Sequence, residues 1–143
     1  MVIDKKNMAE KFTNFMAIAT SGTEKQIVPY ANSASNNTSM IGTAASQGYN
    51  TRTVGSTLIV NGLYITSIVT NVACNISLLI RDVDYPSRPI YVVQNINVPI
   101  NTSFFLDKPI TLTTSQGLFM NMPIGLNPVN TTMHASASCI EIA

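Results

Sequence analysis

Short apolar segments separated by turn residues run from Thr51 to Ala143, and this pattern limits the possible folds more than any other feature of the chain. Some segments alternate strictly, as strands with one buried face do. The clearest one places Cys74, Ile76, Leu78 and Ile80 on one face and Asn75, Ser77, Leu79 and Arg81 on the other. Short strands at about ten-residue spacing predict an all-β, antiparallel β-sandwich of jelly-roll or immunoglobulin-like topology.

The remaining expected strands follow from the same reading. Thr57–Val69 is predicted as one bent strand in which Asn61-Gly62 forms a bulge, because a two-residue turn there would leave very short arms. Asp84–Pro89 contains two prolines and is expected to be a connection outside any ladder. Further strands are expected at Ile90–Ile96, Thr102–Leu106, Ile110–Thr114, Leu118–Met122 and Met133–Ile142.

The first 48 residues differ from the rest and are expected to form an N-terminal arm, with the sandwich domain at 49–143. A short helix is predicted over residues 4–19, with Asp4 as its N-cap. Met8, Phe12, Phe15 and Met16 would share one helix face, which could dock on the chain's own sandwich or on a neighbouring subunit. The polar stretch from Ser21 to Asn50 is expected to be held in place by the chain's own domain or by a neighbour.

The composition favours contact with other proteins over contact with nucleic acid or lipid. Charged residues make up 10% of the chain and the formal net charge is +1, so no basic field attracts polyanions or membranes. Asn, Thr and Ser together contribute 44 of the 143 residues, and such neutral groups are buried between subunits at a lower desolvation cost than charges. Compositional drift in an AT-rich genome is the alternative explanation. No apolar run is long enough for a membrane span, and no secretory signal is expected.

The sequence provides no set of residues for catalysis, and neither a cofactor nor a metal ion is expected. His134 is the only histidine, so it is expected to face solvent on a strand unless symmetry copies form a trimeric site. Asp82 and Asp84 could contribute to a calcium site, although a solvated loop is the default interpretation. The serines lack a nucleophile elbow, and no glycine-rich phosphate loop is present. Cys74 and Cys139 are expected to be buried thiols.

The five tyrosines make carbohydrate binding an alternative function. Sugar-binding sandwiches display exposed aromatic rings, and such a platform could use residues from Tyr30, Tyr49, Tyr64, Tyr85 and Tyr91.

The order of motifs after residue 49 resembles small virion proteins of tailed bacteriophages. In that family an aromatic-rich opening before T-V-G or T-V-P leads to a strand of the form I-G-L-x-x-x-N. A Y-L-V-K-x-x-x-I-P-x-G-S-S-L segment, an L-x-x-G-D-x-L-x-V strand and a terminal S-Y-L-E-I follow. The similar stretches here are Tyr49–Ser56, Val60–Ser67, Tyr91–Leu106, Leu112–Met120 and Ser138–Ile142.

This chain departs from the family pattern at two places. Ser115-Gln116-Gly117 stands where an acidic turn is common, and Cys139 stands where an aromatic residue is common. The resemblance covers residues 49–143, so the role of the first 48 residues rests on composition.

The resemblance implies a noncatalytic structural subunit of a tailed-phage virion, most simply one that decorates or cements the capsid. A neck or tail accessory protein, or a receptor- or glycan-binding module on a fibre or baseplate, is the alternative. The implied partners are other virion proteins and further copies of the chain, with synthesis and assembly in the host cytoplasm. The candidate interface residues are Met8, Phe12, Phe15, Met16, Asp82, Asp84, Tyr85 and Arg88.

Overall fold

The structure is a computed structural model that describes residues 10–40, 49–67, 73–100, 102–123, 125–128 and 131–143. All regular elements in this part of the chain are β-strands. They are β1 (Glu10–Thr20), β2 (Glu24–Val28), β3 (Thr38–Met40), β4 (Tyr49–Thr51), β5 (Thr57–Ser67), β6 (Cys74–Asp82), β7 (Tyr85–Val98), β8 (Ser103–Leu106), β9 (Ile110–Leu112), β10 (Gln116–Asn121) and β11 (Thr132–Ile142).

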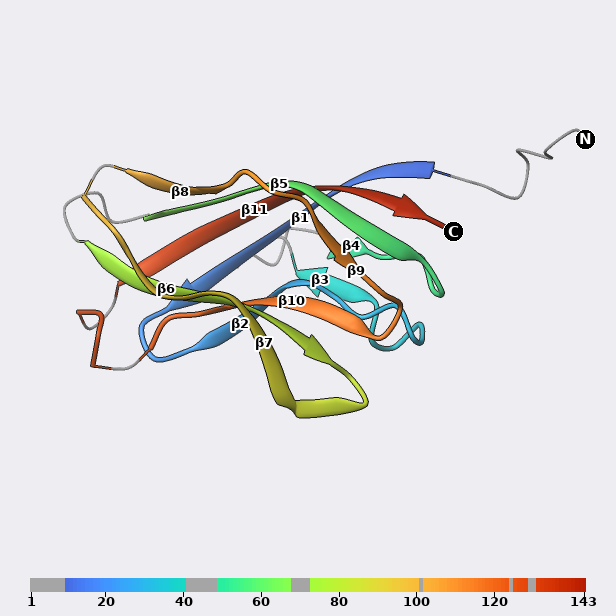
Figure 1. The fold of residues 1–143 in the computed structure, drawn as a ribbon, viewed down its shortest axis with the longest axis horizontal. Coiled ribbons are helices and arrows are strands. Elements are labelled where there is room, and N and C mark those ends of the chain that lie inside the picture. Colours follow the sequence, from blue (N-terminus) through green and yellow to red (C-terminus); the bar gives the residue numbers. More distant parts are fainter. Residues whose placement is uncertain (1–9, 41–48, 68–72, 101, 124, 129–130) are drawn as a thin grey trace, which may run out of the picture.

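Two antiparallel sheets pack face to face, which confirms the predicted β-sandwich (Figure 1). Sheet A has the order β1-β11-β5-β8, and β9 also pairs with β5; sheet B has the order β2-β10-β6-β7. The core lies between the sheets, and its side chains alternate with outward-facing ones most clearly along β11 and the second half of β1. Phe15, Leu58, Ile76, Leu118 and Met133 are among its fully buried members.

The order of the strands identifies a jelly roll. The first strand pairs with the last, β2 pairs with β10, β5 pairs with β8 and β9, and β6 pairs with β7. The chain therefore behaves like one long antiparallel ribbon that is rolled up so that its paired strands alternate between two sheets. In an immunoglobulin-like sandwich, by contrast, the first two strands are neighbours in one sheet.

The predicted helix over residues 4–19 is wrong where the structure describes it, because Glu10–Thr20 is β1. β1 pairs with β11 along its whole length, from Glu10 opposite Ile142 to Thr20 opposite Thr132. Residues 4–9, including Asp4 and Met8, lie outside the described residues. Phe15, Ala17 and Ala19 point into the core at a spacing of two, and two of these three are small residues that add little to an apolar pattern.

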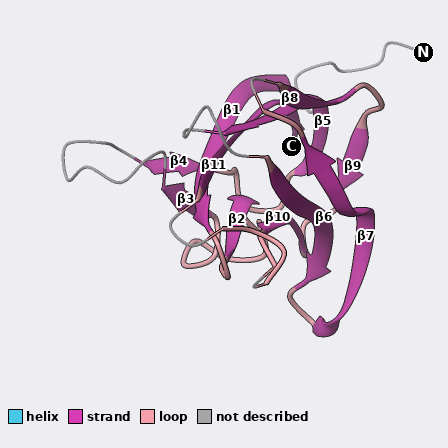
Figure 2. Ribbon diagram, turned by 90° about the vertical axis from the view of Figure 1, so that its left-hand side faces the viewer, coloured by secondary structure: helices cyan, strands magenta, loops and turns pink. Residues whose placement is uncertain are grey.

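The polar segment after β1 is held by its own chain. Ile27 and Val28 of β2 are fully buried in the core, and β2 forms the edge of sheet B beside β10. Further along, Ala31 donates its backbone N–H to the Thr114 carbonyl at 2.8 Å. The β3–β4 hairpin lies beside β1 and β2, on one side of the sandwich (Figure 2).

β5 contains the predicted bulge. Ser138 of β11 lies opposite Gly62 and Cys139 lies opposite Val60, so Asn61 is the extra residue. The bulge keeps Val60 and Leu63 both in the core despite their spacing of three. On the other edge of β5 the partner strand is interrupted at the same level, where Asp107–Pro109 separates β8 from β9.

The predicted proline-containing connection after Asp84 is wrong, because β7 begins at Tyr85 and includes both Pro86 and Pro89. β7 is the outer strand of sheet B, and prolines are tolerated where no ladder partner needs their missing N–H. The register between β6 and β7 shifts three times, so β7 bends strongly away from the sheet at the Tyr85 end (Figure 1).

Candidate functional site

Among the described residues, no group of three or more His, Cys, Asp or Glu side chains could hold a metal ion. His134 sits between the buried residues Met133 and Ala135 on β11, and its own position is on the outer face of sheet A. Nor does any helix in this part of the chain have the length and apolar character to span a membrane.

The N-terminal candidate residues do not share one face. Phe12 is 79% exposed and Phe15 is fully buried, because these residues point to opposite sides of β1. Met16 lies on the same side as Phe12 and is half-buried. Phe15 is therefore a core residue of its own chain, whereas Phe12 and Met16 remain available on the surface.

Phe12 and Met16 belong to the outer face of sheet A. Charged residues border this face: Glu10 lies on the same side of β1 as Phe12, and Asp107 and Lys108 lie in the β8–β9 connection. Residues that are paired on adjacent strands form rows across this face. One row runs from Phe12 through Ile140 and Ile59 to Thr111, and a second runs from Met16 through Ser136 and Tyr64 to Phe105. A third row runs from Ile18 through His134 and Thr66 to Ser103. None of these positions carries Asp, Glu, Lys or Arg.

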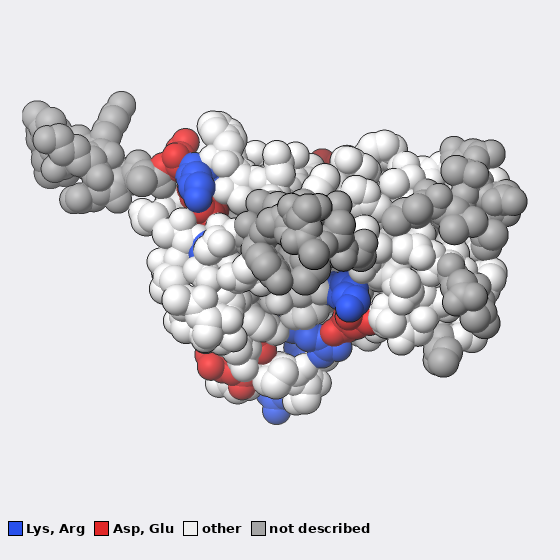
Figure 3. All heavy atoms as spheres, turned by 180° about the vertical axis from the view of Figure 1, so that it is seen from behind, with Lys and Arg blue, Asp and Glu red and all other residues white. Residues whose placement is uncertain are grey.

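Exposed aromatic rings stand at both edges of this face. Phe12 projects from β1, while Phe105 is 69% exposed on β8. Tyr64 on β5 is 40% exposed and packs beside Phe105, with ring centroids 6.3 Å apart. Figure 3 shows the sandwich from the side and not onto this face; on that side, charged side chains occupy only small areas of the described surface. Large exposed apolar side chains within an uncharged area are typical of protein contact surfaces.

The second group of candidates lies at the tip of the β6–β7 hairpin. Asp82 uses both carboxylate oxygens internally: Oδ1 accepts the Asp84 backbone N–H at 2.9 Å, and Oδ2 accepts the Ser115 hydroxyl at 3.0 Å. Asp82 thus closes the hairpin and ties it to the β9–β10 turn. Asp84, Tyr85 and Arg88 are exposed, and Tyr85 reaches 62% exposure.

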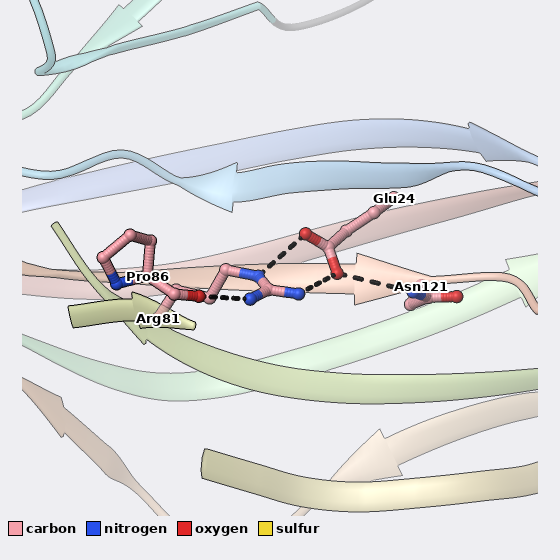
Figure 4. Close-up of polar contacts among 4 residues, drawn as sticks. All are labelled: Glu24, Arg81, Pro86 and Asn121. Atoms are coloured by element: carbon pink, nitrogen blue, oxygen red, sulfur yellow. Dashed lines mark hydrogen bonds and ion pairs between the residues drawn. The ribbon is translucent and has the colours of Figure 1, made fainter. Parts of the chain in front are cut away.

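An ion pair stiffens the outer face of sheet B next to this hairpin. Arg81 on β6 binds both oxygens of Glu24 on β2, at 2.9 and 3.0 Å, across the intervening strand β10 (Figure 4). Its third contact is with the Pro86 carbonyl at 2.7 Å, which anchors the start of β7. The hydrogen bond with Glu24 raises the pKa of Arg81 above its ordinary value. This pair links three elements of the sheet and is already satisfied without a ligand.

Arg52, which sequence reasoning did not single out, is fully buried at one end of the sandwich. Its guanidinium donates to five backbone carbonyls, and the partners at 2.7–3.2 Å belong to Pro29, Ser56, Leu112, Thr113 and Gln116. Pro29 and Gln116 lie at the ends of sheet B strands, while Ser56 and Leu112 lie at the ends of sheet A strands, so Arg52 connects both sheets. Burial lowers its pKa to about 10, which leaves the group charged at neutral pH.

A buried carboxylate accompanies Arg52. Glu141 of β11 is 1% exposed, and its two oxygens accept the backbone N–H of Thr53 at 2.9 Å and the Thr53 hydroxyl at 3.0 Å. Its charge also favours the protonated form of Arg52. Both residues hold the turn before β5 against the sandwich, so this polar cluster is structural.

Both cysteines are buried thiols, as the sequence predicted. Burial, with a smaller contribution from Glu141, raises the pKa of Cys139 to about 12. Because the thiolate is the reactive form, we expect the native protein to react with a disulfide reagent such as DTNB at pH 8 about a thousandfold more slowly than an exposed thiol. The absorbance of the thiolate that DTNB releases measures this rate, and the unfolded protein serves as the reactive control. Rapid labelling of the native protein would contradict the assignment.

Comparison with known proteins gives a similarity of fold. No protein-family model matches the chain, and no curated protein matches it. Among solved structures, a chain of the T13 IBDV viral particle is similar with a TM-score of 0.50 at 6% identity, over 93% of this chain and 30% of that one. A chain of the T=1 particles derived from infectious bursal virus gives a TM-score of 0.45 at 6% identity, over 93% of this chain and 31% of that one. The present chain thus spans about a third of the length of these viral chains.

Proposed function

We propose that the protein is a noncatalytic structural subunit of a virus particle and that it attaches through the outer face of sheet A. The observation that carries the proposal is this face, whose three registered rows carry no charged residue and which exposes Phe12, Tyr64 and Phe105. A jelly-roll fold similar to that of a chain in an icosahedral virus particle supports it.

The size of the face is adequate for a specific contact. The strands β1, β5 and β11 have 11 residues each, and β8 and β9 add 4 and 3. At about 4.8 Å between strands and roughly 3.3 Å per residue, they present an area of roughly 630 Å². A standard protein interface buries about 800 Å² on each partner. Charged groups are depleted at the centre of such interfaces and aromatic residues are enriched, as on this face.

The finer assignment combines this surface with the resemblance of residues 49–143 to small virion proteins of tailed phages. We propose a tailed-phage particle in which the protein decorates or cements the capsid, with other virion proteins and further copies of the chain as its neighbours. Position at the neck or tail is the alternative. In either position the exposed hairpin tip, with Asp84, Tyr85 and Arg88, provides a second, smaller contact.

The test is to count the protein in purified particles. Particles that carry the wild-type protein or a variant are isolated on a density gradient, and quantitative mass spectrometry gives the copies per particle. We expect the double variant Phe12→Asp with Phe105→Asp to reduce the copy number at least tenfold, because two carboxylates would be placed in an uncharged contact. Val54→Asp, at an exposed position in the turn before β5, is the control and should leave the number unchanged.

The possible results separate the parts of the proposal. Absence of the wild-type protein from particles would overturn the proposed function. Wild-type incorporation together with unchanged incorporation of the double variant would overturn the assignment to sheet A. Loss of incorporation with Tyr85→Asp alone would move the main contact to the hairpin tip.

A further inference from the structure

A cleft of about 460 Å³ opens on the outer face of sheet B, on the side of the sandwich opposite the outer face of sheet A. We propose that it binds one residue of a neutral saccharide. The proposal goes beyond the structural role and does not depend on it. The lining residues come from the β1–β2 turn, from β6 and β7, and from the end of β10; they include Ser77, Tyr91, Gln94, Asn95 and Asn121.

A β-bulge in β7 builds one wall of the cleft. Ile76 lies opposite Ile96 and Leu78 lies opposite Val93, so the single residue Ser77 faces both Gln94 and Asn95. Neighbouring residues of a regular strand point to opposite faces, but a bulge can re-aim one of them. Here it places two consecutive amide side chains beside the same cleft.

Asn95 is fixed in an unusual conformation. Its φ of 49° is positive, and no other non-glycine residue in the described part of the chain has a positive φ. Ser77 stabilises this conformation: its hydroxyl oxygen accepts the Asn95 backbone N–H at 2.9 Å, and the hydroxyl pairs with Asn95 Oδ1 at 3.2 Å. Non-glycine residues in this region are strained unless their surroundings hold them there, and such strain is concentrated at binding sites.

Polar groups suitable for a ligand remain around the cleft. Within the described residues, no hydrogen bond occupies the side-chain amide of Gln94 or the amide nitrogen of Asn95. Asn121 on the opposite wall donates from Nδ2 to Glu24 at 3.4 Å, which leaves its side-chain carbonyl as an acceptor (Figure 4). Tyr91 contributes a ring that is 47% exposed at the rim.

The wall formed by the β1–β2 turn is also fixed. Gly22 donates its backbone N–H to the Met122 carbonyl at 2.8 Å, and Met122 donates to the Thr23 carbonyl at 3.0 Å. The cleft is therefore bordered by hydrogen-bonded backbone on one side and by the bulge on the other. Preformed walls reduce the entropy cost of binding a small ligand.

The chemistry of the lining selects the class of ligand. It contains no Lys, Arg or His for an anion and no Asp or Glu for a cation. Among its side chains only Met122 and Pro123 are apolar, and Met122 is fully buried, so a lipid or other apolar ligand would gain little. Amide donors and acceptors beside an exposed tyrosine ring match a molecule that has several hydroxyl groups and an apolar ring face. A neutral sugar has both, and the cleft volume lies within the usual range for small-molecule sites of about 300–1,000 Å³.

Saturation-transfer difference NMR on the full chain tests the proposal with four probes: D-glucose, D-galactose, D-mannose and N-acetyl-D-glucosamine. We expect at least one probe to bind with a Kd of about 1 mM, as is reasonable for one shallow site. Tyr91→Ala and Asn95→Gly should each weaken this binding about tenfold, which corresponds to about 1.4 kcal/mol. Glycine accepts a positive φ, so Asn95→Gly removes the amide while the bulge is kept. Tyr85→Ala removes an exposed tyrosine from the same strand outside the cleft and is the matched control.

Each outcome decides the proposal. Binding of a probe that both cleft variants weaken and the control preserves would support it. No binding by any of the four probes would overturn it, and so would equal binding by the wild type and both cleft variants. Loss of binding by Tyr85→Ala to the same extent would also overturn the assignment to this cleft.

Discussion

Removal of residues 1–48 is expected to abolish cooperative folding of the remaining chain. β1 and β2 are an edge strand of each sheet, and they supply Phe15, Ile27 and Val28 to the core. Truncating one buried Phe costs about 3–5 kcal/mol, and truncating one buried Ile costs about 2–5 kcal/mol. A domain of this size has a total stability of about 5–15 kcal/mol, so the loss of both strands exceeds what the fold can tolerate.

Far-UV circular dichroism and calorimetry of the 49–143 fragment measure this effect. Fragment complementation is the control: adding the 1–48 peptide should restore a cooperative melting transition, because β1 can again pair with β11. The division predicted from the sequence, with an arm at 1–48 and a domain at 49–143, implies instead that the 49–143 fragment folds cooperatively on its own. If the 49–143 fragment alone melts cooperatively near the temperature of the full chain, that division is correct and our expectation is wrong.

Arg52→Met is expected to destabilise the protein by about 3–5 kcal/mol, the cost of breaking a buried charged network. Methionine has a similar length but no donor, so five buried carbonyls at the junction of the two sheets would lose their partner. The buried carboxylate of Glu141 would also lose its neighbouring positive charge. Arg52→Lys should give an intermediate loss, because an ammonium group cannot reproduce the planar fork of the guanidinium.

Urea unfolding followed by circular dichroism gives the free energies. Arg88→Met is the matched control, since Arg88 is exposed on β7 and such surface changes usually remain within about 0.5 kcal/mol. A loss of less than about 1 kcal/mol for Arg52→Met would show that water or side chains replace the guanidinium, and the structural role assigned to Arg52 would then be wrong.

The sequence predicted the strands of the sandwich wherever alternation was strong. β6 is a strand as its pattern predicts, although Ser77 and Leu79 of its predicted outer face are buried too; the bulge at Asn61 follows from the length of the apolar segment around it. Alternation identifies the side of a strand that faces the core, but it does not identify neighbouring strands. The choice between jelly-roll and immunoglobulin-like topology therefore depended on pairings between residues as distant as Phe12 and Ile140.

The N-terminal helix was mispredicted because the large apolar residues of that segment do not all have the same role. Phe12 and Met16 lie on the outer surface and Phe15 lies in the core, so their spacing only imitates a helix face. The inward positions at Ala17 and Ala19 are buried but small, so they add little to the apolar pattern of the segment. Tertiary pairing determined the structure of this segment, and local propensity did not.

Arg52 and the cleft beside Asn95 could not be found from sequence patterns. An arginine in a short polar turn is usually solvated, and its burial depends on five carbonyls that come from four separate parts of the chain. The cleft depends on a register shift of one residue in β7, which alters the direction of Gln94 and Asn95 without any change in composition. Of the surface candidates, the sequence predicts Phe12 on a helix and Tyr85 in a connection, whereas the structure places both on strands, where they are exposed.

The pairing of β1 with β11 also has a consequence for biosynthesis. β1 ends at Thr20 and its partner begins at Thr132, which is 112 residues later. At about 5–20 residues per second, a ribosome needs roughly 6–22 s to produce the partner strand after β1 has been made. Sheet A therefore cannot close until β11 has been synthesised, and during that interval the edge of β1 that pairs with β11 is open. Nascent chains of this protein are accordingly expected to bind chaperones until β11 emerges from the ribosome.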